Sequence, residues 1–149
     1  IVLDNVRSAQ NVGSFFRTAD AFGIEHIALC GISSTPPNRE IHKTALGAEL
    51  TVDWRYFEHT LDAVRALQAD GYTVYAIEQA HGSTLLHDMQ LPKNQKTAII
   101  MGHEVFGVQQ EVVDAANGCI EIPQYGTKHS LNVSVTAGIV MYELSNMLR

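Results

Sequence analysis

Hydrophobic residues recur along this chain in two alternating patterns, one typical of buried strands and one typical of amphipathic helices. Short apolar runs predict strands at residues 1–6, 24–30, 51–57, 72–77, 97–101 and 119–122. Helical periodicity covers residues 11–22, 41–46, 60–70 and 108–116, and a glycine follows each of these segments within two residues. Strands that alternate with helices predict an α/β fold, with a mostly parallel sheet and helices on both faces.

The first and last predicted helices are the most clearly marked. In the first, Asn11 is the expected N-cap and Gly23 is the expected stop. The last helix begins near Val133 and carries a wide apolar stripe as far as Met147. We expect that stripe to pack on the sheet or against a partner.

Composition and charge limit the possible classes of protein. A chain of 149 residues with 46% hydrophobic and 17% charged residues predicts one globular domain over residues 1–149. No apolar run approaches the roughly 20 residues of a membrane helix, and no signal peptide pattern is present. We therefore expect a cytoplasmic protein without a membrane span. Because the first residue is Ile, we also expect a trimmed chain or a fragment. The net charge of -6 argues against non-specific coating of nucleic acid.

Several common kinds of chemistry are excluded by their missing motifs. Cys30 and Cys119 end or begin apolar runs, which predicts free, buried thiols, and no Cys or His spacing indicates a metal site. GxGxxG, GxSxG and HExxH are all absent. The glycines of residues 102–107 have P-loop spacing, but Val and Gln follow them in place of Lys and Ser or Thr. Walker-type nucleotide hydrolysis is therefore excluded.

Polar residues gather instead at three turns that come next to predicted strands. They are Asn11 and Arg17 at the first turn, Gly102, His103 and Glu104 at the second, and Ser130, Asn132 and Ser134 at the third. One such turn is most simply explained as a helix cap. Three turns at the carboxyl ends of strands, where open α/β sheets bind their ligands, predict a functional site.

Three segments that contain these turns carry a family resemblance. NVGSFFRTADAFGI, MGHEVFGV and IEIPQYGTKHSLNVSVTAG resemble the signature motifs of the SpoU/TrmH family, which are RNA ribose 2′-O-methyltransferases of the SPOUT superfamily. Their order and spacing agree with the family over nearly the whole chain. The resemblance implies S-adenosylmethionine as methyl donor, tRNA or rRNA as substrate, and a homodimer. It also implies a deep trefoil knot in the C-terminal part of the fold, which general topology rules would not predict.

The resemblance further assigns roles to individual residues. It implies a catalytic set of Arg17, Asn11, Glu104, Ser130 and Asn132, and donor-binding loops around Gly102, Ile122 and Leu131. Because a guanidinium has a pKa above about 12, we expect Arg17 to stabilise a developing alkoxide on the ribose and not to act as a general base. Asn11 and Glu104 would orient Arg17. Ser130 and Asn132 would contact the ribose or the donor.

Basic residues near the motifs could offset the acidic net charge where RNA binds. They are Arg7, Arg17, Arg39, His42, Lys43, Lys128 and His129. Two alternative functions stay open at this point: a SPOUT enzyme that methylates a base, and an RNA-binding module without catalysis. The sequence does not distinguish tRNA from rRNA.

Overall fold

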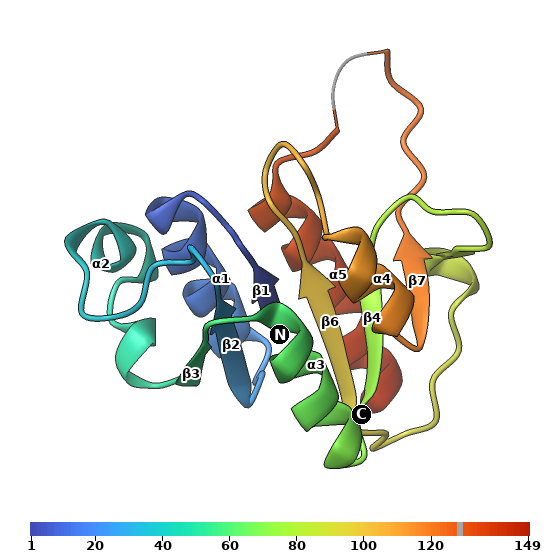
Figure 1. The fold of residues 1–149 in the computed structure, drawn as a ribbon, viewed down its shortest axis with the longest axis horizontal. Helices are drawn as coiled ribbons and strands as arrows, with labels where there is room; N and C mark the ends of the chain where they lie inside the picture. The colour runs from blue at the N-terminus through green and yellow to red at the C-terminus, as the bar shows by residue number, and fades with distance from the viewer. Residues whose placement is uncertain (128–129) are drawn as a thin grey trace.

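The computed structural model describes residues 1–127 and 130–149, which form one seven-stranded sheet flanked by helices (Figure 1). The strands are β1 (Val2–Asp4), β2 (His26–Cys30), β3 (Asp53–Phe57), β4 (Thr73–Ile77), β5 (Thr84–Leu85), β6 (Thr97–Met101) and β7 (Gly118–Glu121). The helices are α1 (Ala9–Ala21), α2 (Arg39–Ala45), α3 (Thr60–Ala69), α4 (Gln110–Ala115) and α5 (Val133–Leu148). Short 3-10 helices cover Ala48–Leu50 and Leu86–Asp88.

The strand order is β3-β2-β1-β6-β4-β7-β5, and every strand pairing is parallel. Parallel strands need crossover connections, and in this chain helices supply most of them. All the carboxyl ends therefore meet at one edge, which is the upper edge in Figure 1. The predicted α/β fold with a parallel sheet is confirmed. The trefoil knot implied by the resemblance stays a prediction.

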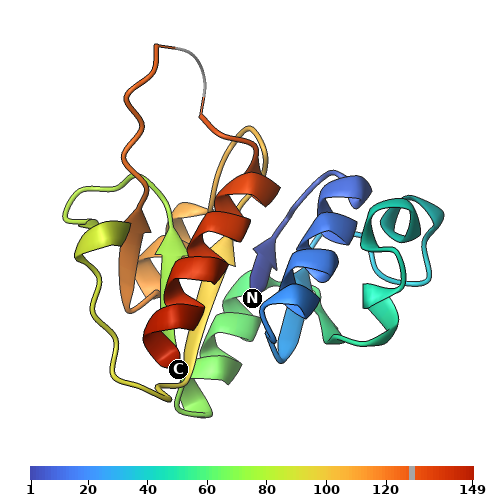
Figure 2. The same cartoon turned by 180° about the vertical axis from the view of Figure 1, so that it is seen from behind.

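Helices cover both faces of the sheet, as predicted. Helices α1 and α5 pack on one face, seen in Figure 2, where α2 packs against α1, and α3 and α4 pack on the other face, seen in Figure 1. Strand β6 is buried on both faces, which explains its apolar sequence. Ile99 and Met101 pack in the core under α1 and α5, while Ala98 and Ile100 pack in the core under α3 and α4. A strand that is buried on both faces carries no polar alternation.

The starts of three helices differ from the predicted ones, and one of them, α4, begins two residues late at Gln110. Helix α1 begins at Ala9 and its N-cap is Ser8, whose hydroxyl oxygen accepts a 3.1 Å hydrogen bond from the backbone N–H of Asn11. The prediction of Asn11 as N-cap is wrong, because Ser8 already caps the helix one turn earlier. Helix α2 likewise begins two residues early, since the side chain of Asn38 accepts from the N–H groups at its start.

Strand β5 was not predicted. It consists of two residues, too few to show alternation, and it pairs only with β7 at the edge of the sheet.

Among the described residues, no helix combines the length and apolar character that a membrane crossing requires.

Both cysteines are free. Cys30 is buried, as predicted, and burial raises the pKa of its thiol to about 12. Cys119 is partly exposed, so the prediction of a buried thiol is wrong there. Its strand β7 lies near the edge of the sheet, between β4 and the two-residue β5.

Candidate functional site

A pocket of about 730 Å³ lies at the carboxyl edge of β4, β6 and β7. Its walls come from the segments that follow these three strands and from the start of α5. Six of the eight predicted site residues line it: Gly102, Glu104, Ile122, Ser130, Leu131 and Asn132. The structure therefore joins the second and third motifs in one pocket. Asn11 and Arg17 do not line it.

The described lining of this pocket contains both acidic and apolar side chains. Its charged side chains are the carboxylates Glu78, Glu104 and Glu121, and it contains no Lys or Arg among the described residues. Apolar lining residues include Ile122, Leu131 and Val133. A cleft lined by negative charge attracts cations. The pocket therefore suits a positively charged ligand with an apolar part better than a phosphate-rich one.

The loop between β6 and α4 is a tight turn held by backbone hydrogen bonds. His103 N–H donates to the carbonyl of Gly107 at 3.0 Å, and Gly107 N–H donates to the carbonyl of His103 at 2.9 Å. Gly102 immediately precedes this turn. A Cβ at Gly102 would come within 3.0 Å of backbone atoms of Gly107 and Val108. Only glycine therefore fits at the base of the turn.

Two carboxylates that were not predicted from the sequence bind the end of this loop that leads into α4. Glu78 Oε2 accepts from Val108 N–H at 3.0 Å, and Asp4 Oδ2 accepts from Gln109 N–H at 2.8 Å. Asp4 is fully buried, and its other oxygen accepts from the Thr60 hydroxyl at 2.6 Å. Glu78 directly follows β4, so the rule that selected Gly102 to Glu104 after β6 could have found it.

Glu104 connects this loop to the start of α1. Its carboxylate accepts from Arg7 N–H at 2.8 Å, from Ser8 N–H at 2.7 Å and from Asn11 Nδ2 at 3.0 Å. Partial burial alone would raise the pKa of Glu104, but the two backbone N–H groups and the Asn11 amide favour the charged form. The net effect lowers the pKa of Glu104 below its ordinary value. The carboxylate therefore stays ionised at neutral pH.

Arg17 stands apart from the other predicted catalytic residues. It lies on α1, six positions after Asn11, and it is exposed. Neither Asn11 nor Glu104 makes a hydrogen bond to Arg17 in the described part of the chain. The structure thus brings Asn11 and Glu104 together, but within this chain neither of them orients Arg17 as expected. It does not bring Arg17 to the pocket of its own chain.

The third motif reaches the pocket through the start of α5. Asn132 is the N-cap of α5, and its Oδ1 accepts from the N–H and the hydroxyl of Ser134 at 2.8 and 2.6 Å. The Leu131 N–H donates to Gln124 Oε1 at 3.1 Å. Because the side-chain oxygen Oδ1 of Asn132 caps the helix, the side-chain NH₂ group is the part that could contact a ligand. Ser130 is exposed at the pocket lining.

The predicted basic surface is partly neutralised by neighbouring acids. Lys43 pairs with Glu40 at 3.0 Å, and His42 contacts Glu49 at 2.8 Å. Three arginines of this predicted surface are exposed and make no ion pair within the described residues: Arg7, Arg17 and Arg39. Lys128 and His129 lie outside the described residues.

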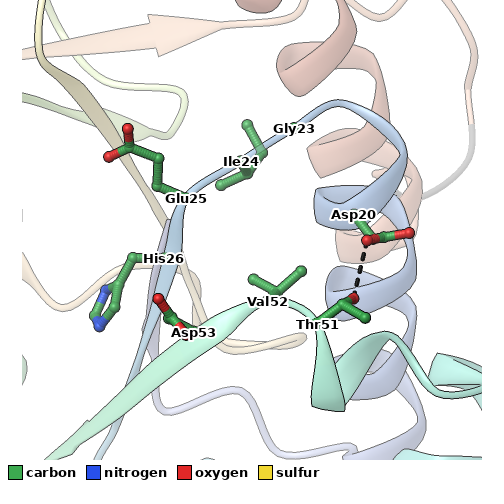
Figure 3. A pocket seen from close by; sticks show the side chains of 8 residues that line it. All are labelled: Asp20, Gly23, Ile24, Glu25, His26, Thr51, Val52 and Asp53. Carbon is green, nitrogen blue, oxygen red and sulfur yellow. Dashed lines mark hydrogen bonds between the residues drawn. The ribbon is translucent and has the colours of Figure 1, made fainter.

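A second pocket, of about 550 Å³, lies at the opposite edge of the sheet, where β2 and β3 begin (Figure 3). Three carboxylates line it, and one of them, Asp20, accepts a hydrogen bond from the Thr51 hydroxyl at 2.9 Å. The side chains of Asp20 and Glu25 lie on opposite sides of the opening and do not converge. No group of described residues has the arrangement of a metal site. None of the predicted site residues lies here.

The fold and the first pocket define an α/β protein with an acidic pocket at the carboxyl edge of a parallel sheet. The chain belongs to the SpoU rRNA Methylase family, whose sequence model matches residues 1–142. It is 31% identical, over 96% of its length, to a tRNA (guanosine(18)-2′-O)-methyltransferase of Thermus thermophilus, and it covers 72% of that enzyme. It is 33% identical to a 23S rRNA (guanosine-2′-O-)-methyltransferase of Vibrio cholerae, over 96% of this chain and 57% of that one.

A solved structure agrees with this membership. The AdoMet-bound rRNA methyltransferase from Sinorhizobium meliloti superposes with a TM-score of 0.91 at 30% identity, over 99% of this chain and 56% of that chain. The chain thus spans little more than half of two of these three relatives. The family, the enzyme class and the methyl donor predicted from the sequence are confirmed at the level of the family.

Proposed function

We propose that this chain transfers a methyl group from S-adenosylmethionine to a ribose 2′-hydroxyl of tRNA or rRNA. The observation that carries the proposal is the single pocket shared by Gly102, Glu104, Ile122 and Leu131, which joins two motifs far apart in sequence. We further propose that residues 1–149 act as one catalytic domain. A tRNA or rRNA substrate would place the protein in the cytoplasm.

The chemistry of the pocket fits the donor. S-adenosylmethionine carries a sulfonium and an ammonium group, which suit the carboxylates, and an adenine ring, which suits the apolar wall of Ile122, Leu131 and Val133. The missing side chain at Gly102 lets the backbone of Gly107 and Val108 close the turn beside the pocket. When bound, this cofactor supplies an electrophilic methyl group on a good leaving group. The protein must then align that methyl with one ribose oxygen.

We assign the remaining steps to the first and third motifs. Glu104 and Asn11 hold the start of α1 against the pocket and so fix the position of that helix. Arg17 stabilises negative charge on the ribose oxygen and holds a neighbouring phosphate. Ser130 and the NH₂ group of Asn132 contact the ribose or the donor at the pocket lining.

Arg17 can fill this role only if another chain brings it to a pocket. Exposed apolar residues on α5, at Val135, Ile139 and Tyr142, form a stripe at helical spacing on the side of α5 away from its buried face. Large exposed apolar patches mark interaction sites. We therefore propose a homodimer in which α5 contributes to the contact and the partner subunit's Arg17 completes the site.

Two alternatives are less well supported. Base methylation is disfavoured because the relatives at 31% and 33% identity are named for ribose methylation. A non-catalytic RNA-binding module is disfavoured because the sequence retains every residue that the family motifs assign to catalysis, including Asn11, Arg17, Glu104 and Asn132. A module without catalysis would not explain the acidic pocket, whereas a base methyltransferase would use the same donor there.

Mapping ribose methylation in total RNA from cells with and without the gene tests the proposal. We expect one or a few 2′-O-methyl positions to be lost without the gene and to return with the wild-type gene. Calorimetry should detect donor binding that a chelator does not abolish. Unchanged ribose methylation, or a lost base methylation, would contradict the proposed reaction.

A further inference from the structure

Phe106 is a large aromatic residue at the mouth of the pocket, and 83% of its surface is exposed. It lies at the tip of the tight turn between β6 and α4, beside Val105, which is also exposed. The turn is anchored at both ends, by Glu104 on α1 and by Glu78 on Val108. A rigid loop thus presents an apolar ring to solvent, at an apparent cost to solubility.

One face of the Phe106 ring is already covered. The His103 imidazole stacks on it with 4.8 Å between ring centroids and 29° between ring planes. His103 is itself fixed, because its Nδ1 accepts from the N–H groups of Val105 and Phe106 at 2.9 and 3.2 Å. The Phe106 ring therefore has a supported back face and a free front face, and its orientation is set before any ligand arrives.

We propose that the free face of Phe106 stacks on an unpaired base of the RNA at the methylated nucleotide. The inference rests on the proposed function, since a ribose aligned with a donor in this pocket carries its base within a few ångströms of the rim. RNA-binding proteins recognise unstacked bases by stacking them on exposed aromatic side chains. A ring that is supported on one face loses little conformational freedom when a base covers the other.

The position of Phe106 favours a base over other occupants. The ring lines the same pocket as Glu104 and Leu131, so an occupant must approach the reacting groups. A second copy of the chain already has a more extensive apolar surface in the α5 stripe. A single exposed ring that is stacked on His103 beside the pocket is better suited to a flat ligand than to the surface of another protein.

The test measures methyl incorporation into total RNA from cells lacking the gene, with S-adenosylmethionine saturating and the RNA concentration varied. Base stacking is worth about 1–3 kcal/mol, so Phe106→Ala should raise the RNA concentration at half-maximal rate about 5- to 150-fold, with little change in the maximal rate. Phe106→Leu should lose nearly as much, because it keeps apolar bulk without a ring. Phe106→Trp and Phe106→Tyr should retain near wild-type values.

Val105→Ala is the matched control, because Val105 is exposed at the same tip and has no ring. It should leave RNA dependence, donor affinity by calorimetry and mass by light scattering unchanged. Wild-type RNA dependence in Phe106→Ala, or full function in Phe106→Leu, would overturn the stacking role while leaving the proposed function intact. A lower mass in both Phe106→Ala and Val105→Ala would assign the tip to a subunit contact instead. A wild-type protein that methylates no RNA would overturn both proposals.

Discussion

The side-chain amide of Asn11 donates a 3.0 Å hydrogen bond to the carboxylate of Glu104, across 93 residues of sequence. The same carboxylate accepts the backbone N–H groups of Arg7 and Ser8. This clasp holds the start of α1 against the loop that forms one wall of the pocket. The first and second motifs are therefore joined by structure, and a change at Glu104 should affect stability as well as activity.

Removing the charge of Glu104 should destabilise the fold. Glu104→Gln keeps the shape of the side chain but replaces one carboxylate oxygen, which accepts hydrogen bonds, with an NH₂ group. That NH₂ group then faces the N–H donors of Arg7, Ser8 or Asn11 and leaves at least one of them without an acceptor. Hydrogen bonds to charged groups contribute about 1.5–3 kcal/mol each, and an unsatisfied partner costs about 1–3 kcal/mol, so we expect a loss of about 1–3 kcal/mol in the free energy of unfolding. Urea denaturation measures it. Glu58→Gln is the control, since Glu58 is exposed and makes no side-chain hydrogen bond among the described contacts.

The clasp should also give the protein an acid-sensitive element. Because the folded state lowers the pKa of Glu104, ionised Glu104 stabilises the fold above the unfolded-state value of about 4.3. That contribution is lost as the pH falls through the lower, folded-state pKa. NMR titration should show the amide resonances of Arg7 and Ser8 moving together with a midpoint below pH 4.3 or so. In Glu104→Gln this transition should be absent, and a midpoint above the ordinary value would contradict the clasp.

Gly102 should be intolerant of even the smallest side chain. A methyl group there would collide with the backbone of Gly107 and Val108, so Gly102→Ala should open the turn and weaken donor binding at least tenfold, which is about 1.4 kcal/mol or more. Gly126→Ala is the matched control, because Gly126 also lines the pocket and a Cβ there meets no atom of the described residues within 4 Å. Calorimetry with S-adenosylmethionine compares the two. Equal donor affinity in both variants would mean that the turn is not needed for binding.

The sequence predicts the fold better than it predicts the contacts between motifs. Strand β6 and the stop of α1 at Gly23 follow from local pattern, because burial on both faces and a positive φ leave a clear signal. Asn11 was wrongly predicted as the N-cap of α1, because asparagine serves equally well as a helix cap and as the donor of a long-range hydrogen bond such as the one to Glu104. Strand β5, at Thr84–Leu85, depends on its neighbour β7 and has no pattern of its own. Such interactions depend on tertiary structure, which periodicity does not report.

The sequence motifs select eight residues, and the structure places six of them in one pocket. The motifs identified six residues that meet in one pocket, since the carboxyl ends of parallel strands share an edge. They also identified Arg17, but its orientation on α1 depends on the register of the whole helix, and it does not line the pocket. Glu78 was missed although it follows a buried strand, because no motif marked it.

The position of Arg17 leads to the last prediction. Arg17→Ala should lower single-turnover methyl transfer about a hundredfold or more, the usual effect of removing a group that stabilises a developing oxyanion. Donor affinity should stay within twofold or so of wild type, because Arg17 does not line the donor pocket. Arg17→Lys should recover little, since it keeps the charge but loses the planar fork that can hold a phosphate and an oxygen together.

Mixed dimers separate the two possible positions of Arg17 during the reaction. Leu131→Arg should block the donor pocket while leaving Arg17 intact, and Arg17→Ala should do the reverse. If the partner subunit's Arg17 completes each site, mixing the two inactive variants restores activity, because a mixed dimer pairs one intact pocket with one intact arginine. If Arg17 instead served its own chain's pocket, every subunit in the mixture would carry a defect and no activity would return. Subunit exchange must be verified by mass spectrometry of the mixed sample, so that an inactive mixture contradicts the shared site.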